Sequence, residues 1–465
     1  MKTIYKILSA VLIVLLSSVS NAKSQFSMPE YSKTTLDNGL TLYLMQQSEV
    51  PMIDVNVVIG SGAIFDGKVA GLAQMTSDNL MFGTRSLDKK SLESALEFVG
   101  AQFYTDASLD YSELSASFAK KDQDEMLAIL AEVLRSPRFD EEEFNKYKNR
   151  YLGTLKRQKE SPNSVIRNYF MQMIFPEHPY RAVVGGDESS VEAADIKSLK
   201  TFYGAHYQPA NIAIVVAGDF ESKKMSNKLT TLFGDWKAEQ PLPKRPSFKE
   251  VAAFDKPRVL LVNKDDARES TFLIGGAGVP RSNPDFVALN VLNTILGGRF
   301  TSWLNDELRV NSGLTYGARS RFLNYKEAGI FYISTFTAND TTEAAIDLAL
   351  KTYSRLWEQG VDAETLKSAK AYVKGQFPPR YETSSELASL LGRMHIYGFD
   401  ESFINEFEQN IDAIDEAQTK TLIKKYFPQD NLQFTVIGKA EEIRDVLKKY
   451  GEVTEIEIKT PGYAL

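Results

Sequence analysis

The chain has 465 residues, of which 43% are hydrophobic, 11% aromatic and 25% charged, and its formal net charge is −7. This composition excludes a disordered chain and a bundle of membrane spans, and the acidic balance disfavours binding to nucleic acid. The length predicts at least two domains, because one hydrophobic core usually serves about 100–200 residues.

The first 22 residues have the pattern of a secretory signal peptide. Lys2 and Lys6 precede an apolar run at 7–16, and small residues at 20–22 form a cleavage site. We expect cleavage after Ala22 and, for a bacterial source, a periplasmic product. The apolar run is too short to span a bilayer in the mature protein, so we expect no stable membrane anchor. An uncleaved anchor is the alternative.

Cysteine is absent, which excludes disulfides, thiolate metal sites and a cysteine nucleophile. The three histidines are His178, His206 and His395. None has a second histidine four residues away, the spacing that places two imidazoles on one helical face. We therefore interpret them as structural or surface residues, with a separate metal site as the alternative.

A strand–strand–helix order is predicted twice. The segments are 40–47, 52–63 and 71–81 in the first half, and 258–263, 270–279 and 285–296 in the second. An asparagine before an apolar strand also recurs, at Asn211 and at Asn431, about 220 residues later. The shared order and spacing favour two duplicated halves over chance repetition.

Prolines and charges at 237–257 predict an extended linker between the halves. The predicted domains are a signal peptide at 1–22, an N-terminal lobe at 23–236, this linker, and a C-terminal lobe at 258–465. Amphipathic helices are also predicted at 88–99, 123–135 and 141–159. The predicted fold class is α+β, in two similar lobes, each an antiparallel-type sheet covered by helices.

The segment 71–84 begins Gly-Leu-Ala-Gln and ends in Gly-Thr after an apolar stretch. It resembles the signature of the pitrilysin/insulinase family of zinc peptidases, which includes the mitochondrial processing peptidase. The resemblance continues in order along nearly the whole mature chain, through 175–180, 207–219 and 298–317. It implies that the two lobes form one half of a clam-shell chamber.

The departures from this family's pattern concern its zinc site. The family uses His-x-x-Glu-His to hold zinc and activate water, and a glutamate on a later helix completes the ligands. The resemblance places these functions at Gln74, Ser77, Asp78 and Thr154, or at Gly153 if the register shifts by one. Since all four groups differ, we expect no zinc and no other cofactor in this chain.

A second family signature is intact at 304–317, which contains Arg309 and Tyr316. Gly313 predicts a helix stop, with Arg309 on the last turn and Tyr316 on the following strand. In the family this pair reaches the active site, where both donors suit a peptide carbonyl or an oxyanion. From residue chemistry alone, a dipole-favoured cation at Arg309 and a half-buried strand aromatic at Tyr316 are the alternatives.

The resemblance implies a non-catalytic, substrate-binding subunit of the two-chain bacterial branch. Its expected partner is a homologous subunit with intact His-x-x-Glu-His that carries zinc, and its substrate is a peptide or an unfolded segment. Arg309 and Tyr316 then serve the partner's active site. The alternatives are a catalytically silent peptide-binding or scaffold protein without a peptidase partner, and an enzyme active alone through a new site.

Overall fold

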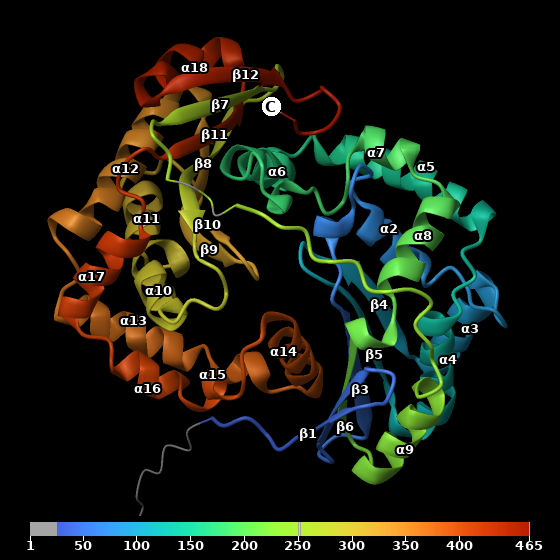
Figure 1. Cartoon of the computed structure of the whole chain (residues 1–465). Helices are drawn as coiled ribbons and strands as arrows, with labels where there is room; N and C mark the ends of the chain where they lie inside the picture. Colours follow the sequence, from blue (N-terminus) through green and yellow to red (C-terminus); the bar gives the residue numbers. More distant parts are fainter. Residues whose placement is uncertain (1–25, 250, 252, 465) are drawn as a thin grey trace, which may run out of the picture.

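The structure, a computed structural model, describes residues 26–249, 251 and 253–464. The predicted signal peptide at 1–22 lies outside these residues. The described chain forms two lobes that face each other, with most of the first half of the sequence in one lobe and most of the second half in the other (Figure 1). None of the helices in the described ranges is long and apolar enough to cross a bilayer.

The N-terminal lobe contains a six-stranded sheet in the order β1-β2-β6-β3-β5-β4. Its strands are β1 (Ser32–Thr35), β2 (Thr41–Gln46), β3 (Met52–Ile59), β4 (Gln102–Ala107), β5 (Ser112–Ala119) and β6 (Ile212–Gly218). Only the β2–β6 pairing is parallel. The central strand β6 is buried at every position, whereas β5 alternates buried and half-buried residues, as expected for a strand with one face on the core.

The C-terminal lobe contains a second six-stranded sheet, in the order β12-β7-β11-β8-β10-β9. Its strands are β7 (Arg258–Asn263), β8 (Glu269–Gly278), β9 (Arg319–Asn324), β10 (Gly329–Ala338), β11 (Gln433–Gly438) and β12 (Glu452–Glu457). Five of them repeat the order and directions of β2, β3, β4, β5 and β6. The sixth differs, because β12 runs parallel to β7 whereas β1 runs antiparallel to β2. The prediction of two similar α+β lobes is confirmed.

Helices cover the outer faces of both sheets (Figure 1). Those of the N-terminal lobe are α2 (Leu72–Asn79), α3 (Lys89–Val99), α4 (Gln123–Arg135), α5 (Glu141–Gln158), α7 (Glu188–Ala193), α8 (Ile196–His206) and α9 (Ser222–Phe233). Those of the C-terminal lobe are α10 (Phe286–Asn293), α11 (Trp303–Asn305), α12 (Thr342–Glu358), α13 (Ala363–Gly375), α15 (Ser402–Asn405), α16 (Phe407–Asp412), α17 (Glu416–Tyr426) and α18 (Ala440–Leu447). Two π-helical turns, Thr294–Gly298 and Asp306–Asn311, follow α10 and α11.

Two helices are exchanged between the lobes. The first-half helix α6 (Pro162–Ile174) packs on β8 and β11 of the C-terminal sheet, and the second-half helix α14 (Ser384–Tyr397) packs on β3 and β6 of the N-terminal sheet. Residues of α14 share one buried cluster with Tyr43, Val58 and Val215. Each lobe therefore completes the other's core.

A buried carboxylate joins the lobes where the linker crosses between them. Asp110, which is 1% exposed, forms an ion pair with Arg245 of the linker. It also accepts hydrogen bonds from the Tyr180 hydroxyl at 2.7 Å and from the Lys326 backbone N–H at 2.9 Å. The described residues between α9 and β7 lie outside helices and strands, so this cluster anchors an otherwise irregular segment.

Candidate functional site

The helix that carries three of the predicted site positions, α2, begins at a fixed turn. Gly71 has a φ of 85°, which favours glycine, and buried Asp66 accepts hydrogen bonds from the N–H groups of Gly71 at 2.7 Å and Ala73 at 2.8 Å. Burial raises the pKa of Asp66 to about 8 against the opposing effect of these hydrogen bonds. The hydrogen bonds to Asp66 therefore fix where α2 begins.

Gln74 and Asp78 occupy successive turns of α2 and bind each other. The Gln74 amide nitrogen donates to Asp78 at 2.9 Å, and the Gln74 amide oxygen accepts from the Ala107 backbone N–H at 3.1 Å. The Tyr147 hydroxyl of α5 donates to the other Asp78 oxygen at 2.6 Å. Burial raises the pKa of Asp78 to about 6, and the hydrogen bonds from Tyr147 and Gln74 lower it in part.

The other two predicted positions make different contacts. The buried Ser77 hydroxyl donates to the Asp106 backbone carbonyl at 3.1 Å. The Thr154 hydroxyl donates to the Arg150 carbonyl of its own helix at 3.2 Å and accepts from Arg157 at 3.0 Å. The structure thus links Gln74 to Asp78, while Ser77 and Thr154 are bonded elsewhere.

These four residues do not fit a zinc ion of the family type. They supply one amide, two hydroxyls and one carboxylate, whereas zinc sites use imidazole, thiolate and carboxylate groups. The carboxylate is already engaged by a phenol and an amide. In the described part of the chain, no group of three or more histidine, aspartate or glutamate residues is placed to hold a metal ion.

The three histidines lie in separate environments. His178 Nδ1 accepts a hydrogen bond from the Tyr180 backbone N–H at 3.0 Å, while its Nε2 is buried without a hydrogen-bond partner. His206 is 2.8 Å from the Ser61 hydroxyl, and burial lowers its pKa to about 4. His395 is 3.2 Å from the hydroxyl of Tyr43, and burial lowers its pKa. The structure does not bring them together.

Arg309 and Tyr316 lie on an exposed part of the C-terminal lobe. Arg309 is in the last turn of the π-helical segment, and its guanidinium lies 4.6 Å from the centre of the Phe300 ring. Gly313 has a φ of 68° just after this turn, as the predicted helix stop requires. The predicted strand position of Tyr316 is wrong, because β9 begins only at Arg319, and Tyr316 lies in the preceding loop.

Tyr316 is 84% exposed, so the alternative of a half-buried strand aromatic is also wrong. Within the described chain its hydroxyl has no hydrogen-bond partner, and none joins it to Arg309. Phe300 and Val310, earlier in the same segment, are also exposed, at 66% and 64%. The segment therefore presents a cation, a phenol and apolar groups outward, where a second molecule can reach them.

Sequence reasoning missed two residues that complete these sites. Tyr147 engages the carboxylate of Asp78, and Phe300 supports the guanidinium of Arg309. Tyr147 lies on the same predicted helix as Thr154, seven residues earlier and so on a similar face. That spacing was the available signal, whereas nothing in the local sequence pairs Phe300 with Arg309.

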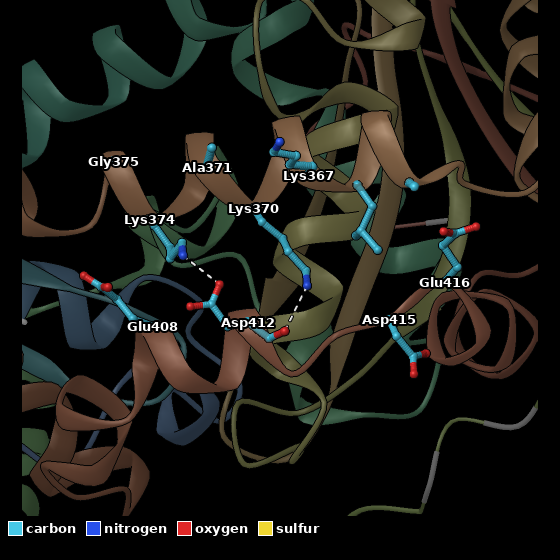
Figure 2. Close-up of a pocket in the computed structure, with 11 residues that line it drawn as sticks. Lys367, Lys370, Ala371, Lys374, Gly375, Glu408, Asp412, Asp415 and Glu416 are labelled. Carbon is cyan, nitrogen blue, oxygen red and sulfur yellow. Dashed lines mark hydrogen bonds and ion pairs between the residues drawn. The ribbon is translucent and has the colours of Figure 1, made fainter.

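A pocket of about 810 Å³ lies between α13 and α16 (Figure 2). Two of its three lysines are engaged: Lys374 contacts the Asp412 carboxylate at 2.6 Å, and Lys370 donates to the Asp412 backbone carbonyl at 3.1 Å. Lys367 and Glu416 also line it, on the exposed face of the helices. Because two of its three lysines bind Asp412, we assign this pocket no chemical role.

Two family descriptions match consecutive parts of the chain. Residues 43–187 match "Insulinase (Peptidase family M16)", and residues 193–373 match "Peptidase M16 inactive domain". Together they span both lobes, including Gln74, Ser77, Asp78 and Thr154 in the first segment and Arg309 and Tyr316 in the second.

Several curated proteins are similar over most of their length. A non-peptidase homolog, YmxG, from Helicobacter pylori is 23% identical over 86% of this chain and 94% of its own. An uncharacterized zinc protease, also YmxG, from Bacillus subtilis is 21% identical over 85% and 95%. A probable mitochondrial-processing peptidase subunit beta from Arabidopsis thaliana is 22% identical over 91% and 81%.

Solved structures share the fold. One, described as a peptidase M16 inactive domain from Pseudomonas fluorescens, has a TM-score of 0.82 and 23% identity, and the match covers 88% of this chain and 98% of that one. A protease from Helicobacter pylori has the same TM-score and 22% identity, over 88% and 100%.

Proposed function

Because the chain belongs to the insulinase family, peptidase family M16, we propose that it is a non-catalytic, substrate-binding subunit of an exported heteromeric zinc metallopeptidase. Its partner is a homologous subunit with intact His-x-x-Glu-His that carries the zinc. Together they act on peptides or unfolded segments, and Arg309 and Tyr316 of this chain complete the partner's active site.

The observation that carries the proposal is the contrast between the two signatures. The positions that hold zinc in the family carry Gln74, Ser77, Asp78 and Thr154, which do not fit the ion. In contrast, the exposed phenol of Tyr316 has no partner within the described chain. An outward-facing hydrogen-bond donor suits a site completed by another molecule.

The names of relatives support the same division of roles. One Helicobacter pylori relative is named a non-peptidase homolog, and the Arabidopsis thaliana relative is named as a subunit of a processing peptidase. Relatives named zinc proteases are as similar in sequence. Because relatives of both kinds occur, these names support a pairing between a silent homologue and a zinc-bearing one.

The test is reconstitution from purified subunits. This chain and its zinc-bearing homologue from the same source are each assayed alone and together for hydrolysis of an unfolded peptide, with size-exclusion chromatography to detect the complex. We expect turnover only in the mixture, with a co-eluting pair. Full activity of the homologue alone, and no complex, would contradict the proposal and favour the peptide-binding or scaffold alternative.

Export is proposed separately, from the signal-peptide pattern at 1–22. Intact mass and N-terminal sequencing of the chain from the native envelope are expected to give a mature terminus at Lys23 in the periplasmic fraction. Retention of Met1 on a cytoplasmic protein would contradict export while leaving the pairing proposal open to the reconstitution test.

A further inference from the structure

A second pocket, of about 420 Å³, lies where the exchanged helix α14 meets the edge strand β9 of the C-terminal sheet. Its volume is within the range of about 300–1,000 Å³ typical of ligand sites. Half of the lining residues are aromatic, and three are arginines, Arg281, Arg380 and Arg393. None of the described residues that line it is acidic.

Arg281 is the central cation of this pocket. Its guanidinium lies 3.9 Å, 4.2 Å and 4.4 Å from the ring centres of Phe286, Phe399 and Phe403, respectively. In the described structure its side chain makes no hydrogen bond or ion pair, although its backbone N–H binds the Tyr325 carbonyl. The rings hold the cation in place but accept none of its N–H groups in a conventional hydrogen bond.

Burial, and to a smaller degree the charge of Arg393, lower the pKa of Arg281 to about 10, against the opposing effect of Tyr381. Both effects express the cost of holding a guanidinium away from water without an anion. Arg393 also lacks an ion-pair partner among the described residues. The charge of Arg393 acts on Glu113 of β5, whose pKa burial raises and the Asn56 hydrogen bond and, more weakly, Arg393 lower in part, but the two side chains form no ion pair.

We propose that this pocket binds a carboxylate carried by an apolar or aromatic peptide residue. The forked N–H groups of Arg281 and Arg393 match the two oxygens of a carboxylate, and the surrounding rings match an apolar side chain next to it. The carboxylate is either the C-terminus of a peptide or an acidic side chain. The proposal rests on the proposed function only in taking a peptide as the ligand.

The test measures binding to the full chain without a partner subunit, by fluorescence polarisation. The probes are four labelled hexapeptides that end in phenylalanine. One is the free acid, one is the C-terminal amide, and two are C-terminal amides with an internal Glu or an internal Gln. We expect the uncharged Gln amide to bind about tenfold or more weaker than a carboxylate-bearing peptide. The free acid or the Glu amide, whichever binds tightly, identifies the source of the carboxylate.

Arg281→Gln and Arg393→Gln are each expected to reduce the preference for the carboxylate by about tenfold, whereas Arg85→Gln, which removes an exposed cation outside the pocket, leaves it unchanged. If Arg281→Gln does not fold, the comparison of the four peptides binding to the unaltered chain still tests the proposal. Equal binding of all four peptides, within about twofold, would overturn the proposal. That outcome would not contradict the proposed function, which is tested separately by turnover of the reconstituted complex.

Discussion

At the scale of single residues, Asp78 is held by hydrogen bonds from two helices. Its carboxylate accepts from Tyr147 of α5 and from Gln74 one turn earlier. These contacts tie α2 to α5 through a hydrogen bond instead of a metal ion. The carboxylate is buried enough to titrate near neutrality, with a pKa of about 6.

This pKa predicts a pH-dependent stability. The folded-state pKa of about 6 exceeds the unfolded value of about 3.9, so the folded chain binds the proton more tightly. The stabilisation is fully present below about pH 4 and is lost as the pH rises to about 6, by about 3 kcal/mol in total. Asp78→Asn removes this contribution.

Urea unfolding of the unaltered chain and of Asp78→Asn, between pH 4 and pH 7, measures the difference. Asp66 also titrates, with a pKa of about 8, but it is present in both proteins and cancels in the comparison. We expect the gap between their free energies of unfolding to change with pH. A constant gap over this range would contradict the assigned pKa.

After dialysis, the isolated chain is expected to hold no stoichiometric zinc and to leave peptides uncut, as measured by elemental analysis and a hydrolysis assay. The double change Gln74→His and Asp78→His is expected not to create activity, because Ser77 and Thr154 still supply neither the base nor the third ligand. One tightly held zinc per chain with chelator-sensitive hydrolysis would contradict this account.

The motif spacing predicts the family's zinc positions at Gln74, Ser77, Asp78 and Thr154 and its donor pair at Arg309 and Tyr316, and these roles stay predictions. The sequence could not show that Tyr316 lies outside the strand, since a short loop and a strand start have the same local pattern. It also could not show that the Tyr147 hydroxyl donates a hydrogen bond to Asp78, because that contact depends on how α2 and α5 pack.

At the scale of elements, Asp110 joins the tip of the β4–β5 hairpin to the linker and to the β9–β10 hairpin. Arg245, Tyr180 and the Lys326 backbone all bind this one buried carboxylate. Asp110→Ala leaves the Arg245 charge and the other donors without their acceptor. We expect it to lower the free energy of unfolding by about 3–5 kcal/mol.

Chemical denaturation measures this loss, and Asp445→Ala is the matched control. Asp445 pairs with Lys448 on an exposed helix end, with 90% of its side chain accessible, and its removal is expected to cost less than about 1 kcal/mol. Similar losses for Asp110→Ala and Asp445→Ala would show that the buried cluster does not hold the lobes together.

Several elements in both halves were predictable, because their periodicity is local. The helix predicted at 123–135 and the strand predicted at 258–263 match α4 and β7 at both ends. The helix predicted at 285–296 ends at Asn293 and continues as a π-helical turn, which the apolar pattern does not distinguish from a regular helix. The edge strand β12 was not predicted, and only two of its six residues are even half-buried.

At the scale of the whole molecule, the exchange of α6 and α14 makes each lobe depend on the other. Local periodicity identifies an amphipathic helix but does not indicate which sheet covers its apolar face. The duplicated order of strands could therefore be predicted, whereas the exchanged helices could not. The linker boundaries predicted at 237 and 257 stay predictions.

The close approach of α14 to the N-terminal sheet predicts the effect of a single methyl group. A Cβ at Gly392 would lie 2.4 Å from the Asn56 side-chain oxygen and 2.9 Å from Val58. Gly392→Ala is therefore expected to destabilise the chain by about 1–3 kcal/mol despite alanine's better helix propensity. Thermal or urea unfolding measures the change.

Gly153→Ala is the control, because its only near neighbour is the flexible Arg157 side chain at 3.4 Å in the middle of α5. This substitution is expected to leave stability unchanged or raise it by up to about 1 kcal/mol. If Gly392→Ala also stabilises, α14 does not pack on the sheet as closely as the structure shows.

The central claim is that this chain completes a partner's active site, and Tyr316→Phe in the reconstituted complex tests it most directly. The change removes one exposed hydroxyl, and Tyr104→Phe, at another exposed tyrosine, is the control. We expect assembly and peptide binding to persist in both, with kcat about 10²–10³ lower only for Tyr316→Phe, as for the loss of one oxyanion donor. Activity within about twofold of the unaltered complex would contradict the claim.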